Sequence, residues 1–304
     1  MRSAPAVQGA MKSLSKQLPK SKPPLPEPVD VRQLSLHVSA QPDNWELPLP
    51  MLRAKALTLL ARDGACRPSM LRGVQRVGER TTFLDEHGNT ISLGRLEAAM
   101  SVSPASRMAS RRRPAPPPRR HVLQSEVAAV RVVYHWPKDA RSVEWSDPVT
   151  FTRPSCGHKD DTVECLLDWV LRVGQAALDV NELDLDGEHE HYGPSLFALG
   201  DVQPTAGELA QETCDFLVNA RVVRRECASA LGRGKILRKA VSTMLHSLPS
   251  SPFSDSELVS RILHSRTTWQ RAYTIARCER HSQAWLALSA DDRRAISVAD
   301  VVRL

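Results

Sequence analysis

The sequence predicts an α+β protein that is mostly helical: a small α+β N-terminal unit, then a β-hairpin plus a helical C-terminal domain, with extended basic, proline-rich arms. Three observations support this class. Helix-start signals recur within residues 205–304. Two runs rich in β-formers flank the segment Pro137-Lys138-Asp139. The 22 prolines cluster where no core can form, and 304 residues suffice for two domains plus arms.

Residues 1–50 are predicted to be an extended basic and proline-rich arm. Met11, Leu14 and Leu18 fall on one helical face, and no acidic residue precedes Glu27. This pattern is typical of a mitochondrial transit segment or of a flexible basic arm. Residues 20–28 should form extended polyproline II, and their Lys-x-x-Pro-x-x-Pro spacing also fits an SH3-type groove.

Residues 51–101 are predicted to form a small α+β unit. Apolar residues recur at helical spacing from Met51 to Ala61. Residues 81–84 and 90–93 should form a β-hairpin, since Gly88 and Asn89 can supply the positive φ of its turn.

Residues 102–125 are predicted to be an arginine- and proline-rich linker between domains. They hold six basic residues and no acidic residue, so they cannot bury apolar area. Their arginines are candidates for contact with a nucleic-acid backbone, because the guanidinium group recognises phosphate well. The candidates are Arg111, Arg112, Arg113, Arg119 and Arg120.

Residues 126–204 are predicted to be an acidic α+β unit, with 15 acidic and 6 basic residues. Residues 127–136 and 143–152 should pair as strands. A helix is expected from Asp161, its cap, to Val180. Asp168 and Asp179 are expected on the solvent-facing side of that helix.

Residues 205–304 are predicted to be a helical domain. Thr205 and Glu208 form a capping box, and the helix they start is expected to continue towards Leu231. Gly232 is expected to end it in the left-handed conformation. The basic residues of the following turn are Arg233, Lys235, Arg238 and Lys239. This turn is not a P-loop, because Ile236 stands where a Ser or Thr is needed and a helix precedes it. It is either a phosphate-backbone contact or an ordinary solvated turn.

We expect no metal site, cofactor or catalytic centre. The acidic loop from Asp184 to His191 could bind a divalent metal, but it has neither calcium-loop nor zinc-ligand spacing. Gly193-Pro194-Ser195-Leu196 is not a nucleophile elbow. The chain is therefore expected not to be an enzyme.

The six cysteines include no Cys-x-x-Cys pair, and several occupy apolar helical positions. They are expected to be reduced, buried residues of an intracellular protein in a reducing compartment, of which the mitochondrial matrix is one. No apolar run reaches the roughly 18 residues of a membrane helix, so no membrane partner is expected.

The function favoured by these features is a non-catalytic structural component of a large nucleic-acid-containing assembly, a ribonucleoprotein such as an organellar ribosome. Its expected partners are RNA or another nucleic acid, through the nine basic residues named above, and neighbouring proteins. Two alternatives stay open: a viral capsid or tegument subunit whose arms clamp neighbouring subunits in a virion, and an adaptor for polyproline-binding domains.

Overall fold

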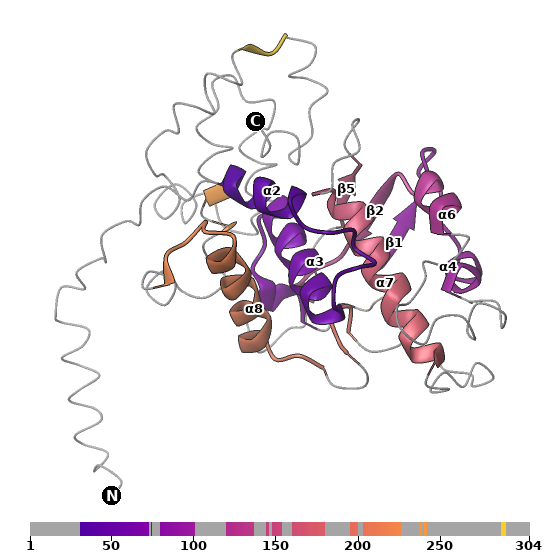
Figure 1. Cartoon of the computed structure of the whole chain (residues 1–304). Helices are drawn as coiled ribbons and strands as arrows, with labels where there is room; N and C mark the ends of the chain where they lie inside the picture. The colour runs from indigo at the N-terminus through magenta and orange to yellow at the C-terminus, as the bar shows by residue number, and fades with distance from the viewer. Residues whose placement is uncertain are drawn as a thin grey trace, which may run out of the picture.

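The computed structural model describes residues 31–72, 74, 80–100, 120–136, 144–145, 148–153, 160–179, 195–199, 203–225, 237–238, 240–241 and 287–289. These residues form helices and a small antiparallel sheet, which confirms the α+β class (Figure 1). The helices are α2 (Val31–Ser39), α3 (Leu49–Asp63), the 3-10 helix η1 (Pro68–Leu71), α4 (Leu93–Met100), α6 (Arg120–Glu126), α7 (Thr162–Asp179) and α8 (Ala206–Asn219).

The sheet has three antiparallel strands in the order β1-β2-β5. They are β1 (Thr81–Leu84), β2 (Ala129–Val132) and β5 (Val149–Thr152), and Phe83 pairs with Val130, which pairs with Phe151. Beyond β2, β3 (His135–Trp136) pairs with β4 (Glu144–Trp145). The predicted pairing of residues 127–136 with 143–152 is therefore confirmed. Strand β1 joins this pair from across the arginine-rich linker, so both predicted α+β units contribute to one sheet.

The predicted turn after β1 is present, but the second arm of its hairpin is not a full strand. Gly88 has a φ of +80°, and the backbone N–H of Ile91 donates to the carbonyl of Phe83 at 2.8 Å. Residue pairing is limited to an isolated bridge between Leu84 and Thr90. Helix α4 begins at Leu93, so β1 takes β2 as its main partner.

Two segments that the sequence predicts to be extended contain helices. Helix α2 lies within the predicted N-terminal arm, where Leu34 and Val38, one turn apart, are fully buried. Helix α6 forms the end of the predicted linker and buries Leu123. Both short helices are stabilised by packing against the core, which local propensity does not reveal. Residues 1–30 and 101–119 lie outside the described residues.

Helix α7 is the centre of the fold. It contacts α3, α4 and β5, and Figure 1 shows it running between the group α2, α3 and α8 and the sheet with α4 and α6. Its described side chains from Cys165 to Val173 are all buried, so this part of the helix has no solvent-facing side, although the sequence predicts one. Helix α8 contacts α3 and η1 on the opposite side of the core.

Candidate functional site

Most of the predicted phosphate-binding residues lie outside the described part of the chain. These are Arg111, Arg112, Arg113, Arg119, Arg233, Lys235 and Lys239. Arg120 is the first residue of α6. Arg238 is only 2% exposed, with its Nη1 3.9 Å from the sulfur of Met70. That position is not the solvent-facing turn that the sequence predicts for Arg238.

The described residues instead expose arginines just after α8. The sequence predicts a helix that continues towards Leu231, but α8 ends at Asn219. Two hydrogen bonds close its end: Arg221 N–H donates to the carbonyl of Val218, and Val222 N–H donates to the carbonyl of Leu217, both at 3.0 Å. This pair of bonds is the Schellman motif, in which a left-handed residue reverses the chain after the last helical turn.

Arg221 holds the left-handed position with a φ of +57°. This position is usually glycine, because a Cβ makes the left-handed conformation cost about 1–2 kcal/mol. Val222 packs against the core, Val223 is 6% exposed, and together they fix the path of the turn. Arg221, Arg224 and Arg225 are all exposed. We call these three arginines the α8 basic turn.

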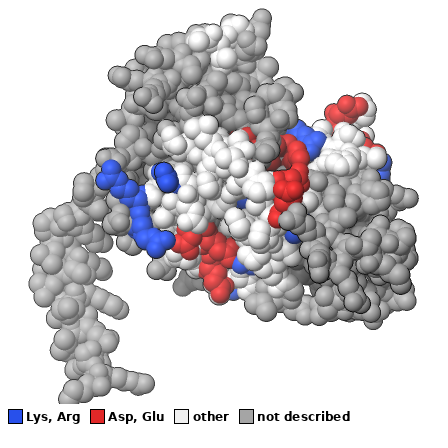
Figure 2. Space-filling model, in the orientation of Figure 1, with Lys and Arg blue, Asp and Glu red and all other residues white. Residues whose placement is uncertain are grey.

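The α8 basic turn stands beside a surface of opposite charge. In Figure 2, basic side chains gather on the side of the molecule where the chain leaves α8, and acidic side chains lie over α8 itself. The acidic residues of the helix are Glu208, Glu212 and Asp215. Glu212 forms an ion pair with Arg53 of α3, which joins the two helices. Charge is therefore segregated between the body of α8 and its C-terminal end.

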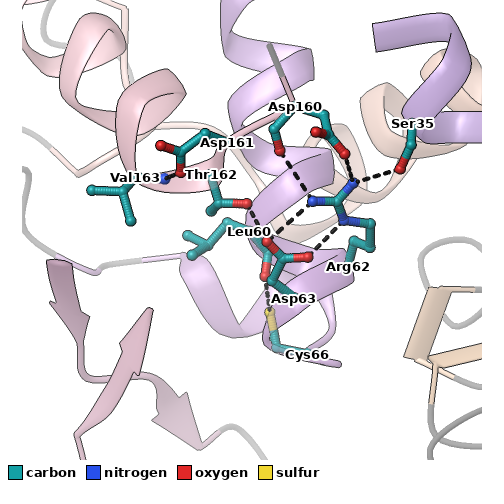
Figure 3. A network of polar contacts seen from close by, with 9 residues as sticks. All are labelled: Ser35, Leu60, Arg62, Asp63, Cys66, Asp160, Asp161, Thr162 and Val163. Carbon is teal, nitrogen blue, oxygen red and sulfur yellow. Dashed lines mark hydrogen bonds and ion pairs between the residues drawn. The ribbon is translucent and has the colours of Figure 1, made fainter. Parts of the chain in front are cut away.

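A buried ionic network holds the other side of α3 to the start of α7 (Figure 3). The guanidinium of Arg62 donates to Asp63 Oδ1 at 2.6 Å, to Asp160 Oδ2 at 2.9 Å and to Ser35 Oγ at 3.2 Å. Burial lowers the pKa of Arg62, but the two carboxylates outweigh burial and raise it above its ordinary value. Thr162 donates its hydroxyl to Asp63, so α2, α3 and α7 meet at one fully buried cation.

The cap of α7 lies beside this network and agrees with the sequence. The backbone N–H of Val163 donates to Asp161 Oδ1 at 2.9 Å, which confirms Asp161 as the cap. The other carboxylate oxygen of Asp161 accepts from Arg153 Nε at 3.0 Å. At the start of α8, Thr205 and Glu208 form the predicted capping box.

The expectation that Asp168 faces solvent is wrong. Its carboxylate is fully buried and accepts hydrogen bonds from Asn44 Nδ2 at 2.9 Å, Trp45 Nε1 at 3.0 Å and Gln124 Nε2 at 3.0 Å. Asn44 also accepts from Lys55 Nζ at 2.7 Å. The residue completes a polar cluster that ties the segment before α3 and helix α6 to α7, which is a structural role.

The three described cysteines, Cys66, Cys165 and Cys214, are buried free thiols, as predicted for these residues. Burial raises the pKa of Cys66 and of Cys165 to about 12. Such thiols are almost entirely protonated at neutral pH and therefore poor nucleophiles.

Among the described residues, no group of three or more His, Cys, Asp or Glu side chains could hold a metal ion. The loop from Asp184 to His191 lies outside them. No described helix combines the length and the apolar character that crossing a membrane requires. No protein-family model matches the chain, and no curated protein or solved structure is significantly similar to it. The α8 basic turn is thus the candidate site, on the evidence of its own geometry.

The sequence predicts a helix that continues towards Leu231, which would place Arg221, Arg224 and Arg225 inside the helix and not after its end. The usual signal of a helix end, glycine or asparagine in the left-handed position, is missing at Arg221. The one local signal is Val222-Val223, a β-branched pair that weakens the helix directly after Arg221.

Proposed function

We propose that the protein is a non-catalytic structural component of a nucleic-acid-containing assembly, of the ribonucleoprotein kind, and that the α8 basic turn contacts the phosphate backbone. The arginine-rich segment 107–120 and the basic residues Arg233, Lys235 and Lys239 are proposed to extend this contact, whereas the buried Arg238 is not. The protein would then be intracellular, which its buried free thiols support.

The observation that carries this proposal is the left-handed arginine at the end of α8. Basic residues near a helix C-terminus interact favourably with the helix dipole, so charge alone has a structural explanation. The positive φ of Arg221 follows from the packing of Val222 and Val223, but this packing does not explain why the position holds arginine, because glycine would close the same motif without the strain. Strained backbone conformations, such as a left-handed residue other than glycine, are concentrated at functional sites.

The chemistry of the turn suits phosphate. Each guanidinium can donate two parallel hydrogen bonds to phosphate oxygens. Arg221, Arg224 and Arg225 lie within five residues, and the anchored Val223 between them limits the motion of the backbone. Such contacts position a protein on a nucleic acid without reading its sequence.

The test is a salt titration of RNA binding by the full-length chain. Replacing all three arginines of the turn by alanine should weaken binding to RNA irrespective of its sequence. The slope of log affinity against log salt should flatten by up to about 2 for single-stranded RNA, since each lost contact contributes about 0.7.

Arg95 and Arg131 provide a matched control, because both are exposed but lie on α4 and β2. The variant Arg95→Ala/Arg131→Ala should bind RNA with the parental slope, and Arg224→Ala/Arg225→Ala should not. Equal slopes for the two double variants would refute the proposal.

A further inference from the structure

A groove of about 450 Å³ lies between α2, α3 and α8, on the side of the molecule where Figure 1 places these helices together. Ala40, Met51, Ala54 and Phe216 provide its apolar lining. Its volume falls in the range of about 300–1,000 Å³ that is typical of ligand pockets. Met51, which is in this lining, is 46% exposed, so its side chain is accessible to a bound ligand.

The described lining of the groove is negatively charged. It contains Glu212 and Asp215 but no lysine or arginine. Arg53 offsets Glu212 by an ion pair, whereas Asp215 is exposed and accepts a hydrogen bond from the neutral Gln211 at 2.9 Å. His37, also in the lining, has its pKa lowered by burial and by Lys55, so it is neutral at pH 7. The groove therefore suits an apolar ligand that carries positive charge.

We propose that residues 11–18 of the same chain bind in this groove as a helix. Met11, Leu14 and Leu18 have the spacing i, i+3, i+7, which is the pattern of anchors with which an amphipathic helix enters a groove. Lys12 and Lys16 supply the positive charge, and no acidic residue precedes Glu27 to oppose it.

The connection between this segment and the groove is long enough. Residues 19–30 join Leu18 to Val31, the first residue of α2. Twelve residues span up to about 40 Å when extended. Helix α2 has 9 residues and is about 13 Å long, and His37 near its end already lines the groove. Residues 11–18 would thus bind against α8, next to the α8 basic turn.

The experiment measures, by fluorescence polarisation, the binding of a fluorescent synthetic peptide of residues 9–20 to the full-length parent chain and to full-length variants. In the first variant, Leu14→Asp and Leu18→Asp disable the chain's own segment and leave the groove vacant. This variant should bind the peptide. The parent should bind it about ten-fold more weakly if the peptide Kd is about 0.1 mM, because a short tether gives an effective concentration of about 1 mM.

Two exposed apolar residues allow a matched control of the site. Met51 lines the groove, and Leu36, which is 55% exposed, is not among its lining residues. Adding Met51→Glu to the disabled chain should abolish peptide binding, and adding Leu36→Glu should not. Thermal unfolding checks that both chains are folded. Asp215→Lys in the disabled chain is an independent second test, and it should weaken binding by removing the exposed carboxylate.

Absence of peptide binding to the disabled chain would overturn the proposal, and so would equal binding to the parent and the disabled chain. A parent that sediments as two copies, where the Leu14→Asp/Leu18→Asp variant sediments as one, would place the segment on a second copy and overturn the intramolecular form. A native protein whose first residue follows Leu18 would overturn it as well. None of these outcomes bears on RNA binding by the α8 basic turn.

Discussion

Two helices of this protein end with a residue in the same left-handed backbone conformation, but that residue is buried at one end and exposed at the other. Helix α3 is followed by Gly64 and Ala65, and α8 by Ala220 and Arg221. Ala65 has a φ of 45° and Arg221 a φ of 57°, so each chain reversal places a residue other than glycine in the left-handed region. Ala65 N–H donates to the carbonyl of Arg62 at 3.2 Å, the counterpart of the bond made by Arg221.

The end of α3 is buried, and its neighbours decide which residues fit. Gly64 has an ordinary φ of −83°, so its backbone does not require glycine. A Cβ at this position would lie 2.4 Å from the hydroxyl of Tyr134 and 3.2 Å from the ring of Phe151. Glycine is therefore required for space, and Ala65, 2% exposed, is the smallest residue with a Cβ.

At the end of α8 the side chain of Arg221 is exposed, so among the described residues burial does not restrict its size. The comparison shows that the two ends share a strained backbone conformation, but packing explains the residue choice only at the buried end. At the exposed end the choice of arginine calls for another reason, and phosphate binding is the one we propose.

The largest effect is expected at the buried end, from Arg62→Ala. The change leaves Asp63 and Asp160 buried without their cation, which should lower the free energy of unfolding by about 3–5 kcal/mol. Urea unfolding measures it. Arg62→Met and Asp63→Asn together should be less damaging than Arg62→Ala alone, because one buried charge is removed with its partner. A loss below about 1 kcal/mol for Arg62→Ala would mean that the network does not hold α3 to α7.

A smaller loss is expected from Gly64→Ala. The new methyl group must displace Tyr134 or the carbonyl of Leu60, 3.0 Å away, and overpacking of this kind costs about 1–3 kcal/mol. The matched control is Gly94→Ala in α4, where a Cβ meets nothing within 4 Å and should be tolerated. Thermal unfolding of both variants decides whether space, rather than backbone conformation, selects glycine at the end of α3.

The start of α8 serves as a reference for its unusual end. Thr205→Ala removes the hydroxyl that accepts from the N–H of Glu208 and should lower the free energy of unfolding by about 1 kcal/mol. Thr205→Ser retains the acceptor and should lose less. Equal losses for alanine and serine would exclude capping as the cause.

At the exposed end, Arg221→Gly should stabilise the protein by about 1 kcal/mol, because glycine adopts the left-handed conformation without strain. Arg221→Ala keeps the strain and should leave stability nearly unchanged. Both variants lack the guanidinium and should weaken RNA binding equally. If Arg221→Gly does not raise the unfolding temperature, the strain argument for the candidate site fails.

The smallest effect concerns pH and the capping box. The backbone N–H of Thr205, followed by its side chain, holds the pKa of Glu208 below its ordinary value of 4.5. A carboxyl with a depressed pKa in the folded state contributes stability above its unfolded pKa and loses it as pH falls through the folded pKa. Glu208→Gln should therefore be slightly less stable than the parent at pH 7 and equal to it in strong acid. A difference that persists at pH 2 would contradict this.

The sequence determined what depends on neighbouring residues. The caps at Asp161 and Thr205 are recognised because a cap and the N–H groups it satisfies lie within three residues. The pairing of residues 127–136, which hold β2 and β3, with residues 143–152, which hold β4 and β5, could be predicted because the two runs follow each other along the chain. Period and composition likewise predicted α3 and α7.

The tertiary structure alone decided the features that depend on distant partners. Strand β1 pairs with β2 across the arginine-rich linker, and Asp168 is buried because Asn44 and Trp45, more than 120 residues earlier, supply donors. Helix α2 is held by burial of Leu34 and Val38 in a core that its own sequence does not specify. The end of α8 at Asn219 could not be predicted from the local sequence either. Packing of Val222 and Val223 imposes on Arg221 a left-handed conformation that arginine does not favour. In each case the deciding free energy comes from contacts between residues far apart in the sequence, which a local pattern does not encode.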